Sequence, residues 1–285
     1  MSEKKQGCLY LCGTPIGNLE DITLRALRIL KEADYIAAED TRHTIKLLNH
    51  YEISKPLLSY HEHNRREKGP ELISLVQKGF KVALVSDAGM PGISDPGADL
   101  VALALEAQIP VTVIPGPSAS LSGLVLSGFS TKRFAFEGFL PLAKKDRKSL
   151  IMSLKSEERT IVLYEAPHRL LSLLQDLYEI LGDRRIAIAR ELTKIYEEVL
   201  HFTLEEAVRH YKENTPRGEF VVILEGLKEN PLKRDFSGIS IEEHLKEYLL
   251  SGMSKKEAVK QVAKDRNLSK SQVYPFSVGL DIDNN

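Results

Sequence analysis

The chain has 285 residues, and 42% of them are hydrophobic, which suffices for buried cores and is typical of about two domains. Its 39 Lys and Arg residues nearly balance 40 Asp and Glu residues, so the net charge of −1 excludes a general attraction to nucleic acid and makes any polyanion site local. No run approaches the ~18 apolar residues of a membrane span, and the N-terminus lacks the apolar segment of a signal peptide. We therefore expect a cytoplasmic protein with no membrane partner.

Strands and helices alternate in the first part of the chain. Strand patterns are expected at 9–12, 35–38, 57–60, 82–85 and 111–114. Helical patterns fill the intervals near 21–32, 41–51, 65–78 and 98–107. This alternation predicts a mainly parallel sheet covered by helices on both faces, and it places a first α/β domain at 1–127.

Three loops rich in glycine and proline follow three of these strands. They are residues 13–18 (GTPIGN), 86–97 (SDAGMPGISDPG) and 115–120 (PGPSAS). Such loops let the backbone approach a ligand closely, and the carboxyl ends of parallel strands meet at one edge of a sheet. The sequence therefore predicts a ligand cleft at that edge rather than three unrelated turns.

The second strand ends in four ionisable residues within five positions, at the same expected edge. They are Glu39, Asp40, Arg42 and His43. One interpretation is that Asp40 or Thr41 caps the next helix while Arg42 pairs with an acid. Their place beside the cleft favours a role in chemistry. His61 and His63 alternate after the third strand, but no further Cys or His at ligand spacing accompanies them, so no metal site is expected.

Strand patterns come closer together after residue 128, which predicts a second, mixed α/β domain at 128–228. Two of its strands end in the charged motifs YEAPHR (164–169) and ARELTK (189–194), which form either an ion-pair network or a wall of the cleft. A basic stretch is the best local candidate for phosphate contacts, although a solvated helix has the same composition. It consists of Lys144, Lys145, Arg147 and Lys148.

Residues 229–285 are polar and helical, and they resemble a helix-turn-helix. Ser254 and Ser269 begin capping boxes, which start helices. Six Lys or Arg residues between 253 and 274 accompany two acids, a pattern that fits a nucleic-acid contact and a solvated helix surface equally well. Pro275 is expected to truncate the last helix, which argues against RNA contacts by the tail 271–285.

The usual nucleotide-binding fingerprints, G-x-G-x-x-G and the P-loop, are absent. A series of specific strings instead resembles the ribosomal RNA small subunit methyltransferase I family, which belongs to the tetrapyrrole methylase superfamily of class III methyltransferases. The resemblance runs almost continuously from residue 9 to about 226. The strings are GTPIGNLEDIT, AAEDTRHT, SYHEHN, VALVSDAGMPGISDPG, PGPSA, EGFLP, LYEAPHRL, ARELTK and RGEFVVILEG.

The resemblance implies two α/β domains of the tetrapyrrole methylase type with a cleft between them, followed by a small helical segment. It also implies a homodimer that uses S-adenosylmethionine to methylate a ribose 2′-hydroxyl. The substrate would be a cytidine in the decoding region of 16S rRNA in the 30S subunit. Three alternatives stay open: a small-molecule, tetrapyrrole-type methyltransferase, a protein methylase resembling diphthine synthase, and a non-enzymatic nucleic-acid-binding protein.

Carried over by motif, the resemblance implies that eleven residues contact the methyl donor. At Met90, where relatives often have Thr, this contact would be to the backbone. The eleven are Pro15, Gly89, Met90, Pro91, Ile93, Ser118, Ala119, Tyr164, Ala166, Leu192 and Glu219. A group must also accept the proton of the 2′-hydroxyl or stabilise the forming alkoxide. The candidates are Glu39, Asp40, His43 and Lys194. Arg42 and Arg190 would orient phosphate or ribose, together with the basic stretch at 144–148.

Overall fold

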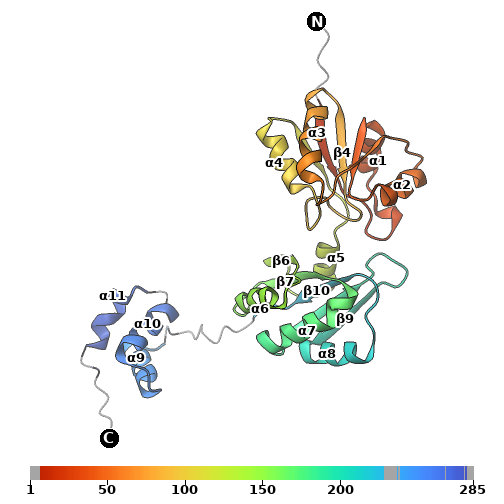
Figure 1. The fold of residues 1–285 in the computed structure, drawn as a ribbon. Coiled ribbons are helices and arrows are strands. Elements are labelled where there is room, and N and C mark those ends of the chain that lie inside the picture. The colour runs from red at the N-terminus through yellow and green to blue at the C-terminus, as the bar shows by residue number, and fades with distance from the viewer. Residues whose placement is uncertain (1–6, 228–235, 237, 267, 279, 281–285) are drawn as a thin grey trace. The chain divides into compact units, whose positions relative to one another are not determined.

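The structure, a computed structural model, describes residues 7–227, 236, 238–266, 268–278 and 280. The chain divides into two compact units, which we call unit 1 (residues 1–226) and unit 2 (residues 227–285) (Figure 1). Unit 1 contains two five-stranded sheets with helices packed on them, so the expected α/β class is confirmed. The domain boundaries drawn at 127 and 228 stay predictions.

Sheet 1 is wholly parallel, with strand order β3-β2-β4-β1-β5. Its strands are β1 (Cys8–Cys12), β2 (Tyr35–Ala38), β3 (Leu57–Ser59), β4 (Lys81–Val85) and β5 (Val111–Ile114). The connecting helices are α1 (Leu24–Glu32), α2 (Thr41–His50), α3 (Arg65–Gln77) and α4 (Ala98–Glu106), with a 3₁₀ turn η1 (Leu19–Asp21) before α1.

Both faces of sheet 1 are buried, as the apolar character of its central strand predicts. Along β4, Val82 and Leu84 pack in the cluster that contains side chains of α3 and α4. Ala83 and Val85 alternate with them and pack in the cluster that contains side chains of α1 and α2. The ribbon shows these two helix pairs on opposite sides of the sheet (Figure 1).

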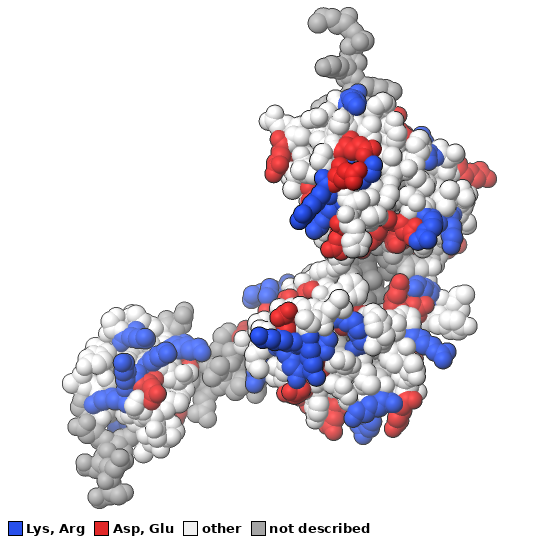
Figure 2. All heavy atoms as spheres, in the orientation of Figure 1, with Lys and Arg blue, Asp and Glu red and all other residues white. Residues whose placement is uncertain are grey.

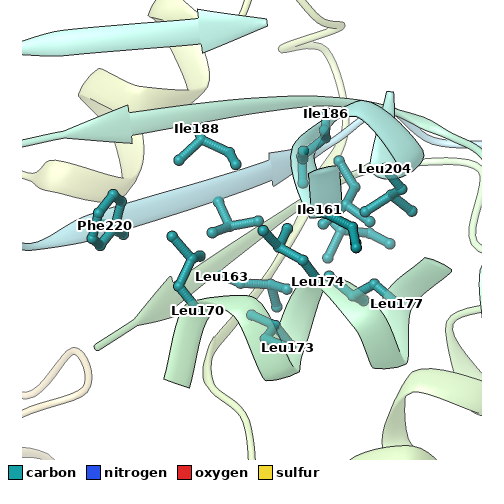
Figure 3. Packing of buried hydrophobic residues seen from close by; sticks show 14 of the residues in the cluster. Ile161, Leu163, Leu170, Leu173, Leu174, Leu177, Ile186, Ile188, Leu204 and Phe220 are labelled. Atoms are coloured by element: carbon teal, nitrogen blue, oxygen red, sulfur yellow. The ribbon is translucent and has the colours of Figure 1, made fainter. Parts of the chain in front are cut away.

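Sheet 2 is mixed, with strand order β6-β7-β10-β8-β9, and only the β6–β7 pair is parallel. Its strands are β6 (Phe134–Phe139), β7 (Thr160–Glu165), β8 (Arg185–Arg190), β9 (Glu198–Thr203) and β10 (Phe220–Leu224). Its helices are α6 (Lys144–Ser153), α7 (Pro167–Leu181) and α8 (Leu204–Glu213). Leucines of α7 pack onto β7 and β8 (Figure 3); they are Leu170, Leu173, Leu174 and Leu177.

Helix α5 (Ala119–Leu126) follows the third Gly/Pro loop of sheet 1 and packs on the other face of sheet 2. Leu124 is buried there against Val221 and Ile223 of β10. Gly123 permits this approach, since a Cβ at that position would lie 3.0 Å from the Val221 side chain. The chain thereby brings the loop edge of sheet 1 to one face of sheet 2.

Unit 2 is a small helical body with its own core. Its elements are α9 (Ile241–Leu250), α10 (Lys255–Asp265), α11 (Lys270–Val273) and the 3₁₀ turn η2 (Tyr274–Ser277). The capping boxes expected at Ser254 and Ser269 are present, and a third one begins α9 at Ser240. Helix α11 ends just before Pro275, as expected. None of the helices in the described part of the chain has both the length and the apolar character needed to cross a membrane.

Candidate active site

A cleft of about 770 Å³ lies in unit 1, a size within the range of small-molecule sites. The loops that follow β4 and β5 form one side of it, and β6, the end of β7 and the start of β10 form the other. Much of the lining is apolar, and we call six of its side chains the apolar wall. They are Ile16, Val113, Phe136, Tyr164, Leu192 and Val221.

The three Gly/Pro loops meet at this cleft, as predicted. The backbones of Thr14 and Gly89 exchange two hydrogen bonds, of 2.9 and 3.0 Å, which join the first loop to the second. The first and third loops touch at Gly13 and Gly116, where a Cβ on Gly13 would lie 2.7 Å from the Gly116 Cα. Gly89 also has a φ of +79°, which disfavours any side chain. The glycines therefore fix the floor of the site.

Three carboxylates line the same cleft: Glu39 at the end of β2, and Asp87 and Asp95 in the loop after β4. Burial raises the pKa of Glu39, and the negative charge of Asp87 raises it further. Burial also raises the pKa of Asp95 to about 7, with contributions from the charges of Glu39 and Asp87. Two acids with raised pKa values in one cleft, Glu39 and Asp95, indicate a functional site.

The sequence reasoning named Glu39 but assigned no role to Asp87 or Asp95. The sequence holds a signal for them, because both acids lie inside the glycine-rich loop 86–97, which is predicted to lie at the cleft. In the structure Asp87 Oδ1 accepts a hydrogen bond of 3.1 Å from the Asp40 backbone N–H, which ties the loop after β4 to the end of β2. Sequence alone does not show that these two acids also lie beside Glu39.

Replacing Asp95 by Asn should stabilise unit 1 more at pH 8 than at pH 5. A carboxyl whose pKa is raised on folding contributes stability below its unfolded pKa, and that stability is lost as the pH rises through about 7. At pH 8 the neutral amide should raise the free energy of unfolding by about 2 kcal/mol, a value discounted because Asp95 keeps partial contact with water. Thermal unfolding at both pH values measures this.

Asp146→Asn, at an exposed position in the first turn of α6, serves as the control and should show no such difference. An equal gain of Asp95→Asn at both pH values would show that charge burial at Asp95 is not the cause.

Asp40, Arg42 and His43 do not line the cleft. Asp40 caps α2, where its Oδ1 accepts a hydrogen bond of 2.8 Å from the backbone N–H of Arg42. Its carboxylate also pairs with the Arg42 guanidinium at 2.7 Å, which holds the pKa of Asp40 well below its usual range. His43 lies exposed on α2. The cap-and-pair interpretation thus describes Asp40 and Arg42, although the Arg42 side chain is 89% exposed.

The wall from sheet 2 contains four of the predicted donor residues, Tyr164, Ala166, Leu192 and Glu219. The Tyr164 hydroxyl accepts a hydrogen bond of 3.1 Å from the Ser120 N–H, so β7 and the start of α5 hold each other in place. On the sheet 1 side, the predicted residues that line the cleft are Gly89, Met90, Ile93, Ser118 and Ala119. Pro15 and Pro91 are buried and do not line it. The donor contacts themselves stay predictions.

Lys194 and Arg190 do not line the cleft either. The Lys194 ammonium bridges the carboxylates of Glu191, at 3.0 Å, and Glu219, at 2.8 Å. These two contacts raise the pKa of Lys194 against the opposing effect of desolvation. Arg190 lies 3.2 Å from Glu198. Both cations thus belong to ion pairs, one of which holds the cleft residue Glu219.

The basic stretch on α6 divides into an exposed and a buried part, which corrects its assignment as a whole to phosphate contacts. Arg147 is buried, and its guanidinium donates to Asp176 of α7 at 2.6 and 2.8 Å. Lys148 pairs with Glu179 of the same helix at 2.6 Å. These pairs hold α6 on α7 and leave Lys144 and Lys145 as the exposed members of the stretch.

Glu165, at the end of β7, lines the cleft and has an unusual carboxylate. Its side chain is fully buried, and its Oε2 atom has no hydrogen-bond partner among the described residues. Its Oε1 accepts from the Ala166 N–H at 2.9 Å and lies 3.3 Å from Arg169. A buried carboxylate oxygen without a partner is costly, so it is suited to accept a hydrogen bond from a ligand.

In the described part of the chain, no cluster of His, Cys, Asp or Glu is arranged to hold a metal ion.

Comparison with known proteins gives consistent results. The profile of the family described as "Tetrapyrrole (Corrin/Porphyrin) Methylases" matches residues 8–208. A protein of Halalkalibacterium halodurans named "Ribosomal RNA small subunit methyltransferase I" is 51% identical, with 94% of each chain covered. Two proteins of the same name also match. The one from Synechocystis sp. is 48% identical, with 97% of this chain and 99% of the relative covered. The one from Thermotoga maritima is 52% identical, with 77% of this chain and 99% of the relative covered.

Solved structures with the same fold have lower sequence identity. Uroporphyrin-III-C-methyltransferase from Thermus thermophilus is 23% identical with a TM-score of 0.53, over 76% of this chain and 94% of that one. The cobalamin biosynthetic enzyme cobalt precorrin-4 methyltransferase is 14% identical with a TM-score of 0.59, over 78% of this chain and 95% of that one. At these identities the likeness concerns the fold alone.

Proposed function

This chain belongs to the ribosomal RNA small subunit methyltransferase I family of tetrapyrrole methylases, and from that premise we propose that it methylates the ribose 2′-oxygen of a cytidine in the decoding region of 16S rRNA, with S-adenosylmethionine as donor. The coarser part, methyl transfer to rRNA, follows from the family. The observation that supports the proposed donor and the proposed base is the acidic cleft of unit 1, where Glu39 lies beside Asp87 and Asp95.

The cleft fits this donor in charge and in polarity. S-adenosylmethionine supplies an electrophilic methyl group on a positively charged sulfur. Three carboxylates in a partly enclosed cleft attract a cation. The apolar wall suits the flat face of an adenine, and the buried Oε2 of Glu165 is ready to accept a hydrogen bond. Backbone groups of the Gly/Pro loops, around Gly89 and Ser118, would fix the donor's orientation.

Glu39 is our candidate for the group that accepts the proton of the 2′-hydroxyl. It lines the cleft, and its raised pKa makes it a stronger base than an ordinary carboxylate. Asp40 is a poor base because Arg42 and the helix cap stabilise its ionised form. Positioning of the hydroxyl against the methyl carbon supplies most of the remaining acceleration. The exposed Arg42, Lys144 and Lys145 would hold phosphates of the RNA.

The direct test of substrate class is methyl transfer to two acceptors. With labelled S-adenosylmethionine, the chain should label 30S subunits that lack the modification and should leave a uroporphyrin-type tetrapyrrole unlabelled. Transfer to the tetrapyrrole with none to 30S subunits would establish the small-molecule alternative. Donor binding without transfer to either would overturn both enzyme assignments.

We also propose a homodimer, and an exposed apolar strip on α5 supports it. Leu121, Val125 and Leu126 are exposed there, and Leu121 lies at the cleft. A second copy would cover such a strip and close the cleft's rim. Sedimentation velocity at micromolar concentration should give a mass near twice the 32.0 kDa of the chain. A mass near 32.0 kDa would contradict the proposal.

A further inference from the structure

Unit 2 has a groove of its own, of about 770 Å³, formed by α10, α11 and η2. Its floor includes the buried Val259, and its rim carries Ser271 and Tyr274. Four lysines line it, three from α10 and one from α11; they are Lys255, Lys256, Lys260 and Lys270. No residue of this groove has a part in the chemistry proposed for unit 1.

The groove is electropositive because four lysines line it and no acid stands among its described lining residues. Among the described residues, Lys256 and Lys270 have no acid at ion-pair distance, and Lys260 interacts through its charge with Glu257, three residues before it on α10. The one acid in the first turn of α10, Glu257, uses its carboxylate in the capping box, where the Ser254 hydroxyl donates to it at 2.6 Å. The other acids of the unit's helices lie mostly on α9. Figure 2 shows Lys and Arg side chains across one face of unit 2 with few acids between them.

Aromatic surface accompanies this charge. The Tyr274 side chain is 62% exposed on the rim of the groove, and Phe276, two residues later, is 39% exposed. Lysines beside an exposed aromatic ring are the combination that binds unpaired nucleic acid, because the cations track phosphates and a base stacks on the ring. A merely solvated helix surface needs neither the groove nor the exposed ring. Pro275 ends the helical run, but the chain continues as the 3₁₀ turn η2, which keeps Tyr274 on the rim of the groove, so this part of the tail can still contact RNA.

We propose that this groove binds the phosphate backbone of an unpaired segment of rRNA, so that unit 2 acts as a docking module for the substrate of unit 1. The inference rests on the proposed rRNA methylation. The Thermotoga maritima relative supports a role in affinity rather than chemistry: 220 residues of this chain cover 99% of that protein. Residues 7–226 alone number 220, so its length has room for unit 1 and not for unit 2 as well.

The test compares two double variants of the full chain. Lys260→Ala with Lys270→Ala removes two groove charges, and Lys246→Ala with Lys264→Ala removes two exposed lysines of unit 2 outside the groove. The groove variant should bind a 16S rRNA transcript about tenfold more weakly at physiological salt, with the slope of log K against log salt reduced by about 1.4. The control variant should bind as wild type does.

A second pair of variants tests the aromatic contact. Tyr274→Ala should weaken binding of the transcript about tenfold, and Tyr274→Phe, which keeps the ring, should bind like wild type. In methyl transfer to 30S subunits, the groove variants should raise KM and leave the turnover at saturating substrate unchanged, because unit 1 keeps its cleft.

Equal binding of the transcript by wild type and both groove variants would overturn the docking proposal, even where the wild type methylates 30S subunits. If only intact 30S subunits distinguished the variants, the groove would recognise a surface of the assembled subunit, and the proposal that it binds an unpaired rRNA segment would fail. If wild type binds the transcript and transfers no methyl group, the proposed function is wrong while the binding comparison still decides the role of the groove.

Discussion

Replacing Glu39 by Gln should lower the rate of methyl transfer by about 10²–10⁴-fold, the usual contribution of general-base catalysis. Gln has the same shape and cannot accept a proton at neutral pH. The pH dependence provides the decisive signature. A base acts in its ionised form, so the wild-type rate should fall as the pH drops through the raised pKa of Glu39, and the variant should lose this acid limb. Single-turnover rates across the pH range measure both effects.

Two controls separate a lost base from a lost donor site. Calorimetry of S-adenosylmethionine should show that Glu39→Gln still binds the donor, since Asp87 and Asp95 remain in the cleft. Glu62→Gln, an exposed acid outside the cleft lining, should methylate like wild type. A Glu39→Gln rate within tenfold of wild type, with the acid limb intact, would move the base to Asp87 or Asp95.

Replacing Ala119 by Leu should weaken binding of S-adenosylmethionine about 100-fold. Ala119 is the first residue of α5, lines the cleft, and packs at the edge of the cluster beneath it. A larger side chain there must enter the cleft or displace packed neighbours, and such overpacking costs about 1–3 kcal/mol. Isothermal titration calorimetry measures the affinity, and the melting temperature checks that the fold persists.

The matched control is Ala143→Leu, the same substitution at the exposed N-cap of α6. It should bind the donor with wild-type affinity. Unchanged affinity in Ala119→Leu would contradict our placement of the donor in this cleft.

Much of sheet 1 and its loop edge could be predicted because the signals are local. Each strand is a short apolar run, and in β4 successive residues alternate between two buried clusters. The loops after β1, β4 and β5 predict the cleft because their glycine and proline residues indicate a backbone that can approach a ligand closely. Sheet 2 was harder to predict, since the strand order β6-β7-β10-β8-β9 depends on pairings between distant residues.

The site residues likewise divide into those with a local sequence signal and those whose position depends on distant parts of the chain. Whether Asp40 caps a helix or enters a cleft depends on where β2 ends relative to β4, which no single sequence shows. Arg147 offered a better clue: it lies four residues before the buried Ile151 and seven before Leu154, a spacing that turns it toward the core. The charge of the stretch alone does not reveal that spacing. The orphan oxygen of Glu165 is a property of the folded cleft alone.

The most direct test of the central claim is to map the methyl group. Subunits from cells that lack this protein should be incubated with the chain and labelled S-adenosylmethionine, and nuclease fragments of the 16S rRNA should be analysed by mass spectrometry. Our account predicts label on one ribose 2′-oxygen, that of a cytidine in the decoding region. Label on a base, label outside that region, or no label despite bound donor would contradict it.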